Sequence, residues 1–251
     1  MAGSAGFKDH FSHGSDDYRR WRPRYPRELF AWLASATPST RLAWDCATGN
    51  GQAAIGLADF FDRVAATDAS AAQVAAAEPH ARITYEVAPA EASPLDGENV
   101  DLVTVAQALH WFDLERFHAE VRRVLRPGGL LAEWGYGLAD IDSRIDVAMR
   151  RFANQTVGRF WPPERAMIES GYEGVPFPFE RMTTPAFAMT ARWDLDRLIA
   201  YLGTWSSVNG YRKEIGEDPL PAFREELATL WGDGEREIRW PLLLRVGRRP
   251  S

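Results

Sequence analysis

Cysteine, basic residues and long apolar runs are all scarce in this chain. Cys46 is the only cysteine among 251 residues, so an intrachain disulfide and a cysteine-rich zinc site are excluded. The 29 lysines and arginines are outnumbered by 35 acidic residues, and the net charge of −6 argues against a nucleic acid or an anionic membrane as partner. No stretch approaches the roughly eighteen apolar residues of a membrane helix, and the N-terminus lacks the apolar core of a signal peptide. We expect a cytoplasmic protein without a bound metal, whose oligomeric state stays open.

Apolar residues make up 45% of the chain, enough for one large α/β core. The most informative segment is 41–68, which predicts a strand, a glycine-rich turn, a helix and a second strand. Asp45 ends the first strand, and Gly49 and Gly51 lack side chains, so a ligand can approach the backbone of the turn. Asp68 follows about twenty residues after the glycines, where such units place a carboxylate against two ribose hydroxyls.

Two cofactors are compatible with this unit. The spacing Gly49-x-Gly51-x-x-Ala54 satisfies the dinucleotide pattern, whose last position accepts alanine. Read from Asp45, the same turn gives Asp45-x-Ala47-x-Gly49-x-Gly51, close to the acidic turn of S-adenosylmethionine (SAM) sites. An acid there can face the ammonium group of SAM but would repel a pyrophosphate. Ala47 stands where glycine is usual, and its methyl group is tolerable if its φ is negative.

The rest of the sequence alternates between expected strands and helices. Strands are expected over 42–45, 64–67, 83–87, 100–105, 130–134, 180–189 and 237–246, the last of them antiparallel. Helices are expected over 25–36, 52–61, 70–77, 114–125 and 194–206, with further helix within 136–175. This order predicts a Rossmann-like, mostly parallel sheet of seven strands with helices on both faces.

The order also divides one structural domain into four segments. Residues 1–40 form an N-terminal helical cap or lid, and 41–135 form the cofactor-binding core. Residues 136–235 form a helical region with one strand, inserted before the last strand, and 236–251 complete the sheet. Because the N-terminal segment is polar and contains Gly3, Gly6 and Gly14, we expect it to order over the bound cofactor up to Tyr25.

Six motifs occur in a characteristic succession. They are Tyr18-x-x-Trp21-Arg22-Pro23-x-Tyr25-Pro26, Asp45-Cys46-Ala47-Thr48-Gly49-Asn50-Gly51-Gln52, Thr67-Asp68-Ala69-Ser70, Ala88-Pro89-Ala90-Glu91, Gln107-Ala108-Leu109-His110-Trp111-Phe112 and Leu125-Arg126-Pro127-Gly128-Gly129. The ordered set resembles the class I SAM-dependent methyltransferases, and more narrowly the group similar to trans-aconitate methyltransferase within the methyltransferase 11 type. The resemblance covers nearly the full length of the chain.

The resemblance implies roles for the turn and for the end of the second strand. Gly49 and Gly51, in the same turn as Ala47, would give close backbone approach to the methionine half of SAM. Asp45 would hold the ammonium group of that half. Asp68 would accept hydrogen bonds from the ribose hydroxyls.

Further positions are implied at the other strand ends. Ala90 and Glu91 would frame the adenine, and Ala69 would pack on its face. Gln107, at the end of the fourth strand, would lie beneath the sulfonium. Tyr18 or Arg22 in the N-terminal segment could close over the carboxylate of the cofactor.

The acceptor is expected at the same edge of the sheet. His110 and Trp111 lie just past the fourth strand, where open α/β sheets bind ligands. His110 could act as a general base for a phenol, an amine or an enolisable carbon, or it could orient a carboxylate that is already ionised. Trp134, Tyr136 and Trp161 are expected to line the acceptor pocket, because aromatic residues are dense in and next to the helical region.

The sequence thus predicts methyl transfer from SAM to a small-molecule acceptor, leaving S-adenosylhomocysteine as the product. The resemblance implies a carboxylic acid as acceptor. Two alternatives stay open: an NAD(P)-dependent oxidoreductase that uses the turn Gly49-x-Gly51-x-x-Ala54, and a non-catalytic interaction protein with the SAM-binding fold.

Overall fold

The computed structural model describes residues 22–251, and the expected roles of Tyr18 and of the lid before Arg22 lie outside them. Within this part of the chain the strands are β1 (Leu42–Cys46), β2 (Arg63–Asp68), β3 (Ile83–Val87), β4 (Val100–Ala106), β5 (Leu125–Tyr136), β6 (Glu180–Arg181), β7 (Ala188–Trp193) and β8 (Arg236–Arg248). The helices are α2 (Arg27–Ala36), α3 (Gln52–Ala58), α4 (Ala71–Ala75), α5 (Leu114–Val124), α6 (Ser143–Arg151), α7 (Ala166–Glu169), α8 (Leu195–Leu202), α9 (Ser206–Ile215) and α10 (Leu220–Trp231).

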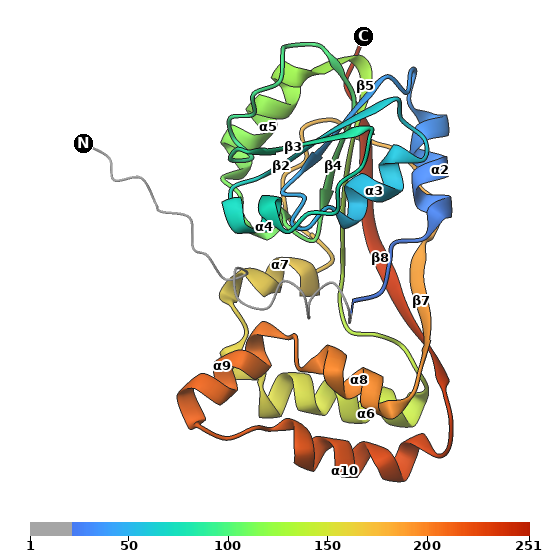
Figure 1. Ribbon diagram of the computed structural model, residues 1–251, viewed down its shortest axis with the longest axis vertical. Coiled ribbons are helices and arrows are strands. Elements are labelled where there is room, and N and C mark those ends of the chain that lie inside the picture. The colour runs from blue at the N-terminus through green and yellow to red at the C-terminus, as the bar shows by residue number, and fades with distance from the viewer. Residues whose placement is uncertain (1–21) are drawn as a thin grey trace, which may run out of the picture.

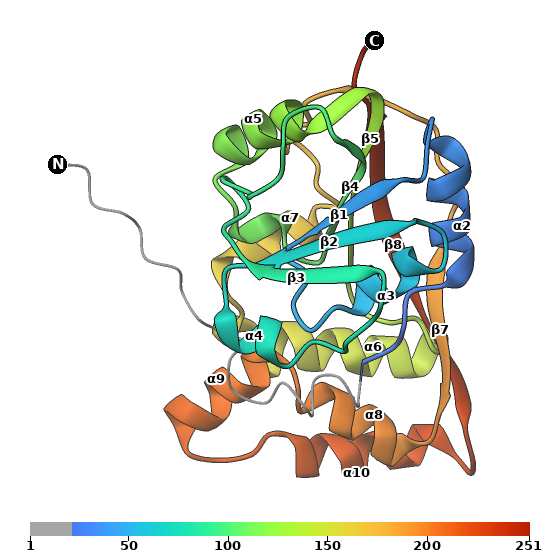
Figure 2. The ribbon, with the colours of Figure 1, turned by 45° about the horizontal axis from the view of Figure 1, so that its top comes forward.

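A single mixed sheet organises the molecule, with the strand order β3-β2-β1-β4-β5-β8-β6 and β7 paired to β8. The pairs from β3 to β5 are parallel, and β8 runs antiparallel to β5, as the sequence predicts. Strand order reverses between β1 and β4, which both run toward the same edge of the sheet (Figures 1 and 2). Open α/β sheets bind ligands at such a switch point, outside the carboxyl ends of the strands.

The Rossmann-like fold class is confirmed, and residues 22–251 form eight strands in place of the expected seven. The strand expected over 180–189 is two strands, β6 and β7, which pair with different stretches of β8. Pro185 lies between them and has no N–H group to donate to a sheet ladder. The interruption lets β8 pair with β6 at one end and with β7 at the other.

The helical region also differs in detail from the expectation. The helix expected over 194–206 ends at Leu202, and a new helix, α9, begins at Ser206. Helix α10 was not predicted. Strand β5 begins at Leu125, upstream of the expected residue 130, and its pairing with β4 shifts register between Val100 and Leu102 to accommodate the Pro127-Gly128-Gly129 segment.

Two apolar clusters cover the two faces of the sheet. One joins the sheet to α2, α3 and the helices of the region after β5, and the other packs α5 against β1, β4 and β5. Strand β1 is buried along its full length, as expected for a strand covered on both faces. Helices α6, α8, α9 and α10 form a layer below the sheet in Figure 1, opposite the end at which the chain terminates.

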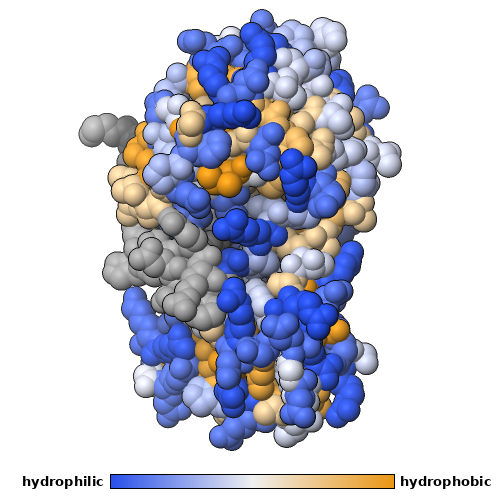
Figure 3. Space-filling view, turned by 45° about the vertical axis from the view of Figure 1, so that its right-hand side comes forward, coloured by the Kyte–Doolittle hydropathy of each residue, from blue (hydrophilic) through white to orange (hydrophobic). Residues whose placement is uncertain are grey.

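Polar side chains dominate the helical layer on the face drawn in Figure 3, and hydrophobic ones form only small patches there. No helix within residues 22–251 is long and apolar enough to cross a membrane.

Candidate functional site

The turn after β1 is built around two glycines in the left-handed region. Gly49 has φ +57° and Gly51 has φ +91°, a conformation that strains residues with a side chain. A Cβ atom on Gly51 would lie 2.3 Å from the hydroxyl oxygen of Tyr85, so this position has no space for one. A Cβ on Gly49 would meet nothing closer than 3.9 Å, so open space adjoins the backbone of the turn. The turn therefore has the cradle shape that close backbone approach to a ligand needs.

Ala47 does not meet the condition of a negative φ. Its φ is +54°, so its methyl group is held in the left-handed region. That conformation costs an L-residue about 1–2 kcal/mol relative to the right-handed region. Gln107, at the end of β4, has φ +57° as well. The protein therefore stores backbone strain at the ends of both central strands, where strain is common in functional sites.

Asp45 is buried at the end of β1, with 1% of its surface exposed. Its two carboxylate oxygens accept hydrogen bonds from the hydroxyls of Thr48, at 2.5 Å, and of Thr104, at 2.8 Å. Burial raises the pKa of Asp45 to about 6, against the lowering effect of these hydrogen bonds. Asp45 thus fixes the shape of the turn, and the backbone N–H of Ala54 provides a further hydrogen bond to its carboxylate.

Asp68 lies at the end of β2, beside the turn, and is 9% exposed. One carboxylate oxygen accepts from the backbone N–H of Gly49 at 2.8 Å, and the other accepts from the N–H of Ser70 at 2.8 Å. Asp68 therefore joins the glycine turn of β1 to the end of β2. Ala69, the next residue, is exposed.

The loop after β3 brings Ala90 and Glu91 to the same edge. Ala90 is buried in the cluster under α5. The carboxylate of Glu91 accepts a hydrogen bond of 3.0 Å from the backbone N–H of Asp113, the residue that caps the N-terminus of α5. Glu91 therefore connects the loop to α5.

Gln107 connects the ends of β4 and β5. Its side-chain oxygen accepts from the N–H of Tyr136 at 2.8 Å, and its side-chain nitrogen donates to the carbonyl of Tyr136 at 3.2 Å. A Cβ on the neighbouring Gly135 would lie 2.9 Å from that side-chain oxygen and 2.4 Å from the hydroxyl of Tyr172. The amide of Gln107 is thus held in one orientation at the sheet edge.

A cavity of about 750 Å³ lies next to Gln107, between the sheet edge and the helical layer. It is lined by Gln107, His110, Trp111, Tyr136 and Trp161, and by residues of α8, α9 and α10. Arg22 also lines it and donates to the hydroxyl of Tyr136 at 2.7 Å. Most of the aromatic residues expected around the acceptor therefore come together in one place.

The charged residues of the cavity wall are mainly basic. Among residues 22–251, four arginines, Arg22, Arg165, Arg212 and Arg224, line it together with a single acid, Asp218. Arg212 pairs with Asp218 at 2.9 Å, whereas Arg165 pairs with Glu169 at 2.8 Å and Arg224 with Asp196 at 2.7 Å, two acids that lie outside the wall. The guanidinium of Arg165 also stacks on the ring of Trp161, 3.7 Å from its centroid. An acidic protein thus encloses a cavity suited to an anion.

Sequence reasoning missed Arg165, Arg212 and Arg224. Arg165 is 47 residues before Arg212, and Arg224 is 12 residues after it; each reads in the sequence as the polar side of a surface helix or loop. Only the packing of the 3₁₀ turn Pro163–Arg165, α9 and α10 brings them to one cavity, so no local signal could have found them.

His110 lies in the 3₁₀ turn Leu109–Trp111 after β4 and faces this cavity. Burial lowers the pKa of His110 to about 4, with Glu164 opposing and Arg165 reinforcing the change. Among the described residues, its Nδ1 atom is buried and has no hydrogen-bond partner. His110 is therefore neutral at pH 7 and offers an unpaired nitrogen.

Trp134 is not among the residues of the cavity wall. It is 1% exposed and packs edge-on against Tyr25, with ring centroids 5.5 Å apart, and against Phe30 at 6.3 Å. Trp134 belongs to the core under α2: it lies on the same face of β5 as Tyr136, but two residues before it and further from the end of the strand that adjoins the cavity.

The site fits SAM in its donor set and its shape. The glycine cradle, the strand-end carboxylate of Asp68 and the polar end of β4 lie at one sheet edge, as the methionine, ribose and sulfonium parts of SAM require. Within residues 22–251 no group of three or more His, Cys, Asp or Glu side chains could hold a metal ion.

Comparison with known proteins agrees with this geometry. Residues 44–132 match the family model of the methyltransferase domain. An inferred methyltransferase of Dictyostelium discoideum is 35% identical over 97% of this chain and 96% of its own length. The structure of an inferred type II methyltransferase from Anaeromyxobacter dehalogenans is 45% identical, covers 92% of this chain and 99% of its own, and superposes with a TM-score of 0.87.

A more distant structure shares the fold alone. It is a phosphoethanolamine N-methyltransferase of Haemonchus contortus in complex with SAM, with 17% identity, a TM-score of 0.50, and 96% of this chain and 58% of that chain covered. The dinucleotide interpretation of the glycine turn is therefore set aside. The chain belongs to the class I SAM-dependent methyltransferases.

Proposed function

We propose that this enzyme transfers the methyl group of SAM to a carboxylate oxygen of a small organic acid. The observation that carries the proposal is the cavity beside Gln107, whose wall, within the described part of the chain, holds four arginines and one acid in a protein of net charge −6. A guanidinium binds a carboxylate through two parallel hydrogen bonds, which fixes the orientation of the acid. The aromatic walls from Trp111 and Trp161 would enclose an apolar body.

A carboxylate acceptor, which needs no general base, is compatible with the neutral form of His110. SAM supplies a methyl group on a positively charged sulfur, and transfer requires in-line alignment of the acceptor oxygen, the methyl carbon and the sulfur. A carboxylate is already ionised at neutral pH, so no general base is needed. A neutral His110 would donate a hydrogen bond to the acid and hold it in line, and Arg165 would supply the positive charge. This assignment keeps His110 as an orienting group.

The cofactor residues are proposed on the same basis. Asp68 would accept the ribose hydroxyls, and the turn at Gly49 and Gly51 would bind the methionine half. The carboxylate of Asp45, which lies beneath the turn, would attract the ammonium group by its negative charge. Gln107, already held by Tyr136, would lie next to the sulfonium.

A labelling panel tests the proposal. Purified protein is incubated with methyl-labelled SAM and separate sets of carboxylic acids, phenols, amines and thiols. We expect labelled methyl esters from one or more acids, which mild alkali hydrolyses. Label found only in amines or thiols would contradict the proposal, and binding of SAM without any labelled acceptor would favour the non-catalytic alternative.

Arg165→Gln then tests the role of the cavity. With an acid substrate in hand, the loss of a charged hydrogen bond should raise the acceptor KM by about 10- to 100-fold while the KM for SAM changes little. Arg192→Gln is the control, since Arg192 is 70% exposed on β7 and forms only a surface pair with Glu235. Equal effects of the two substitutions would show that Arg165 does not bind the acceptor.

A further inference from the structure

The loop between β3 and β4 carries part of the proposed cofactor site without regular structure of its own. Residues 88–99 contain no helix or strand, yet Ala90 and Glu91 within them are the residues assigned to the adenine. Such a loop needs external contacts to hold one conformation, since ordering each residue costs about 1–2 kcal/mol of backbone entropy. The contacts that hold this loop come mainly from α5.

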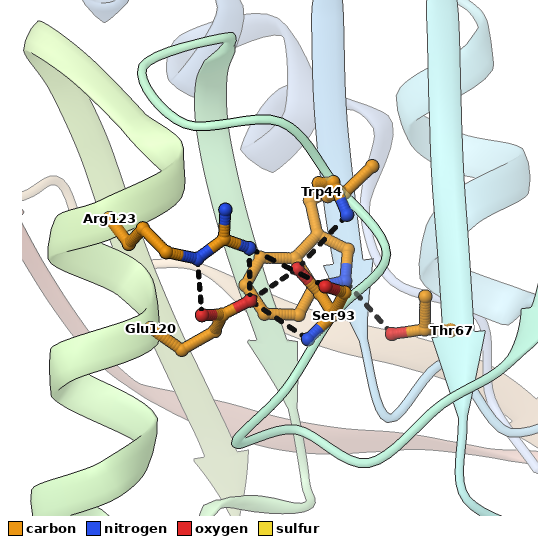
Figure 4. Close-up of polar contacts among 6 residues, drawn as sticks. Trp44, Thr67, Ser93, Glu120 and Arg123 are labelled. Atoms are coloured by element: carbon orange, nitrogen blue, oxygen red, sulfur yellow. Dashed lines mark hydrogen bonds and ion pairs between the residues drawn. The ribbon is translucent and has the colours of Figure 1, made fainter.

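One contact is a buried carboxylate on α5. Glu120 is 7% exposed, and one of its oxygens accepts from both the backbone N–H of Ser93, at 2.8 Å, and the hydroxyl of Ser93, at 2.6 Å. Arg123, one turn further along α5, donates to the two oxygens of Glu120 at 2.7 and 2.6 Å. Figure 4 shows Glu120 and Arg123 reaching from the helix to Ser93 on the loop.

A second contact lies at the start of the same helix. Glu91 accepts from the backbone N–H of Asp113, the N-cap of α5. Glu120 follows Asp113 by seven residues, or about two helical turns, so the two contacts lie on neighbouring parts of one rigid element. Residues 91 and 93 of the loop are therefore both tied to α5, immediately after Ala90.

The chemistry of Glu120 shows that the contact is specific. Burial alone would raise the pKa of Glu120, but the hydrogen bonds from Arg123 and Ser93 outweigh it and the pKa lies below its usual value. The carboxylate is thus ionised and well compensated on the loop side. An apolar residue would fill the same space at lower desolvation cost, but it could not accept the two hydrogen bonds of Ser93.

We propose that Glu120 is a positioning residue for the cofactor: by holding Ser93, it fixes Ala90 and Glu91 against the adenine of SAM. The inference rests on the proposed function, with SAM as the cofactor, and on the adenine-framing roles that the family resemblance implies for those two residues. It predicts that the contact controls affinity for the adenosine half and leaves the methyl-transfer step unaffected.

Glu120→Ala is the principal test, with the affinity for S-adenosylhomocysteine measured by calorimetry. We expect the Kd to rise about tenfold, and the Kd for 5′-methylthioadenosine, which has adenine and ribose but no amino acid part, to rise by the same factor. Ser93→Ala removes the hydroxyl but keeps the backbone donor, so it should raise both Kd values less, by about threefold. Glu226→Gln on α10, which breaks a half-exposed surface pair with Arg151, is the control and should change neither.

Hydrogen exchange gives a readout that needs no ligand. In Glu120→Ala the amides of residues 90–95 should exchange faster than in the wild type, while those in the middle of α5 keep their protection. Addition of S-adenosylhomocysteine should partly restore the protection of the loop amides. If Glu120→Ala is too unstable to purify, Glu120→Gln replaces it in both measurements. The neutral amide oxygen of the glutamine accepts the hydrogen bonds of Ser93 more weakly than a carboxylate does, so the same changes are expected.

The outcomes separate this inference from the assignment beneath it. A folded Glu120→Ala protein with wild-type affinity for both ligands would overturn the positioning role. A loss for S-adenosylhomocysteine without a loss for methylthioadenosine would also overturn it, because the effect would then pass through the methionine half. If Glu91→Ala leaves the affinity for methylthioadenosine unchanged while Glu120→Ala lowers it, the adenine assignment fails instead.

Discussion

Asp45 and Asp68 end neighbouring strands and differ in what their environment does to the carboxylate. Asp68 receives two backbone N–H groups and lies at the surface of the site. Asp45 is enclosed, and burial raises its pKa to about 6 despite two hydroxyl donors. The positive charge of a ligand ammonium group near the turn would therefore stabilise the ionised form of Asp45. The ionised carboxylate would in turn strengthen binding of the ligand.

The affinity for S-adenosylhomocysteine should consequently depend on the protonation of Asp45. Its pKa of about 6 in the free protein means that the carboxylate is ionised at pH 7.5 and largely protonated at pH 5.5. If the ammonium group requires the ionised form, binding should weaken about fourfold between these two values and should release protons near pH 6. Calorimetry in buffers of different ionisation enthalpy measures both effects. The Asp45→Asn variant should bind more weakly at pH 7.5 and show no such pH dependence; an unchanged dependence would assign it to another group.

The state of His110 predicts the pH profile of the reaction. Because its pKa is lowered to about 4, His110 stays neutral from pH 5.5 to 8, and kcat/KM for the acceptor at saturating SAM should be flat over this range. The midpoint near 6.5 expected of an ordinary histidine base should be absent. His110→Ala should raise the acceptor KM about tenfold through the lost hydrogen bond. His80→Ala, at an exposed position before β3, is the control. A profile that rises through pH 6.5 and vanishes in His110→Ala would identify a general base.

At the scale of elements, β5 and β8 are joined by a buried ion pair as well as by their antiparallel ladder. Glu133 on β5 accepts from the guanidinium of Arg245 on β8 at 2.5 Å, and the two side chains are 0% and 3% exposed. Arg245 also donates to the carbonyl of Val175 at 2.9 Å, so it ties the segment after α7 to the sheet. This pair fixes the antiparallel strand beside the reactive edge.

Removal of one charge from this pair should be strongly destabilising. Glu133→Gln leaves Arg245 charged in the interior, and we expect the free energy of unfolding to fall by about 3–5 kcal/mol. Urea denaturation followed by tryptophan fluorescence measures the change. Glu214→Gln provides the matched comparison, since Glu214 and its partner Arg159 are 64% and 66% exposed, and it should cost less than about 1 kcal/mol. Similar losses in both variants would mean that the buried pair contributes no more than a surface pair.

For the whole molecule, cofactor binding should appear as thermal stabilisation, because the site joins the turn of β1, the end of β2 and the end of β4. S-adenosylhomocysteine at 100 times its Kd adds about 2.7 kcal/mol, which for a chain of this size raises the Tm by about 5–10 °C. NAD at the same concentration should leave the Tm unchanged. Asp68→Ala should lose most of the shift with S-adenosylhomocysteine while remaining folded. A shift with NAD alone would contradict the family assignment.

The cofactor half of the protein could be predicted from the sequence. Strands β1 to β4 agree with the predicted ones within one or two residues, and Asp45, Gly49, Gly51, Asp68 and Gln107 lie at one edge of the sheet. The reason is local: glycine spacing, strand length and a strand-end acid are read within a few residues of each other, and parallel strands bring their carboxyl ends together by topology alone. The family resemblance came from the same segments.

The cavity proposed for the acceptor was decided by tertiary structure. Arg165 and Arg224 reach one cavity only because the 3₁₀ turn before α7 and helix α10 both pack beneath the sheet, and no periodicity in the sequence predicts that they come together. Burial, a property of the packed chain, makes His110 neutral and removes Trp134 from the wall. The left-handed φ of Ala47 is imposed by the turn it occupies. Short-range patterns determined the fold and the glycine turn. Side chains that come together from distant elements determined the charge, shape and protonation of the cavity proposed for the acceptor, because those properties depend on what surrounds each group after packing.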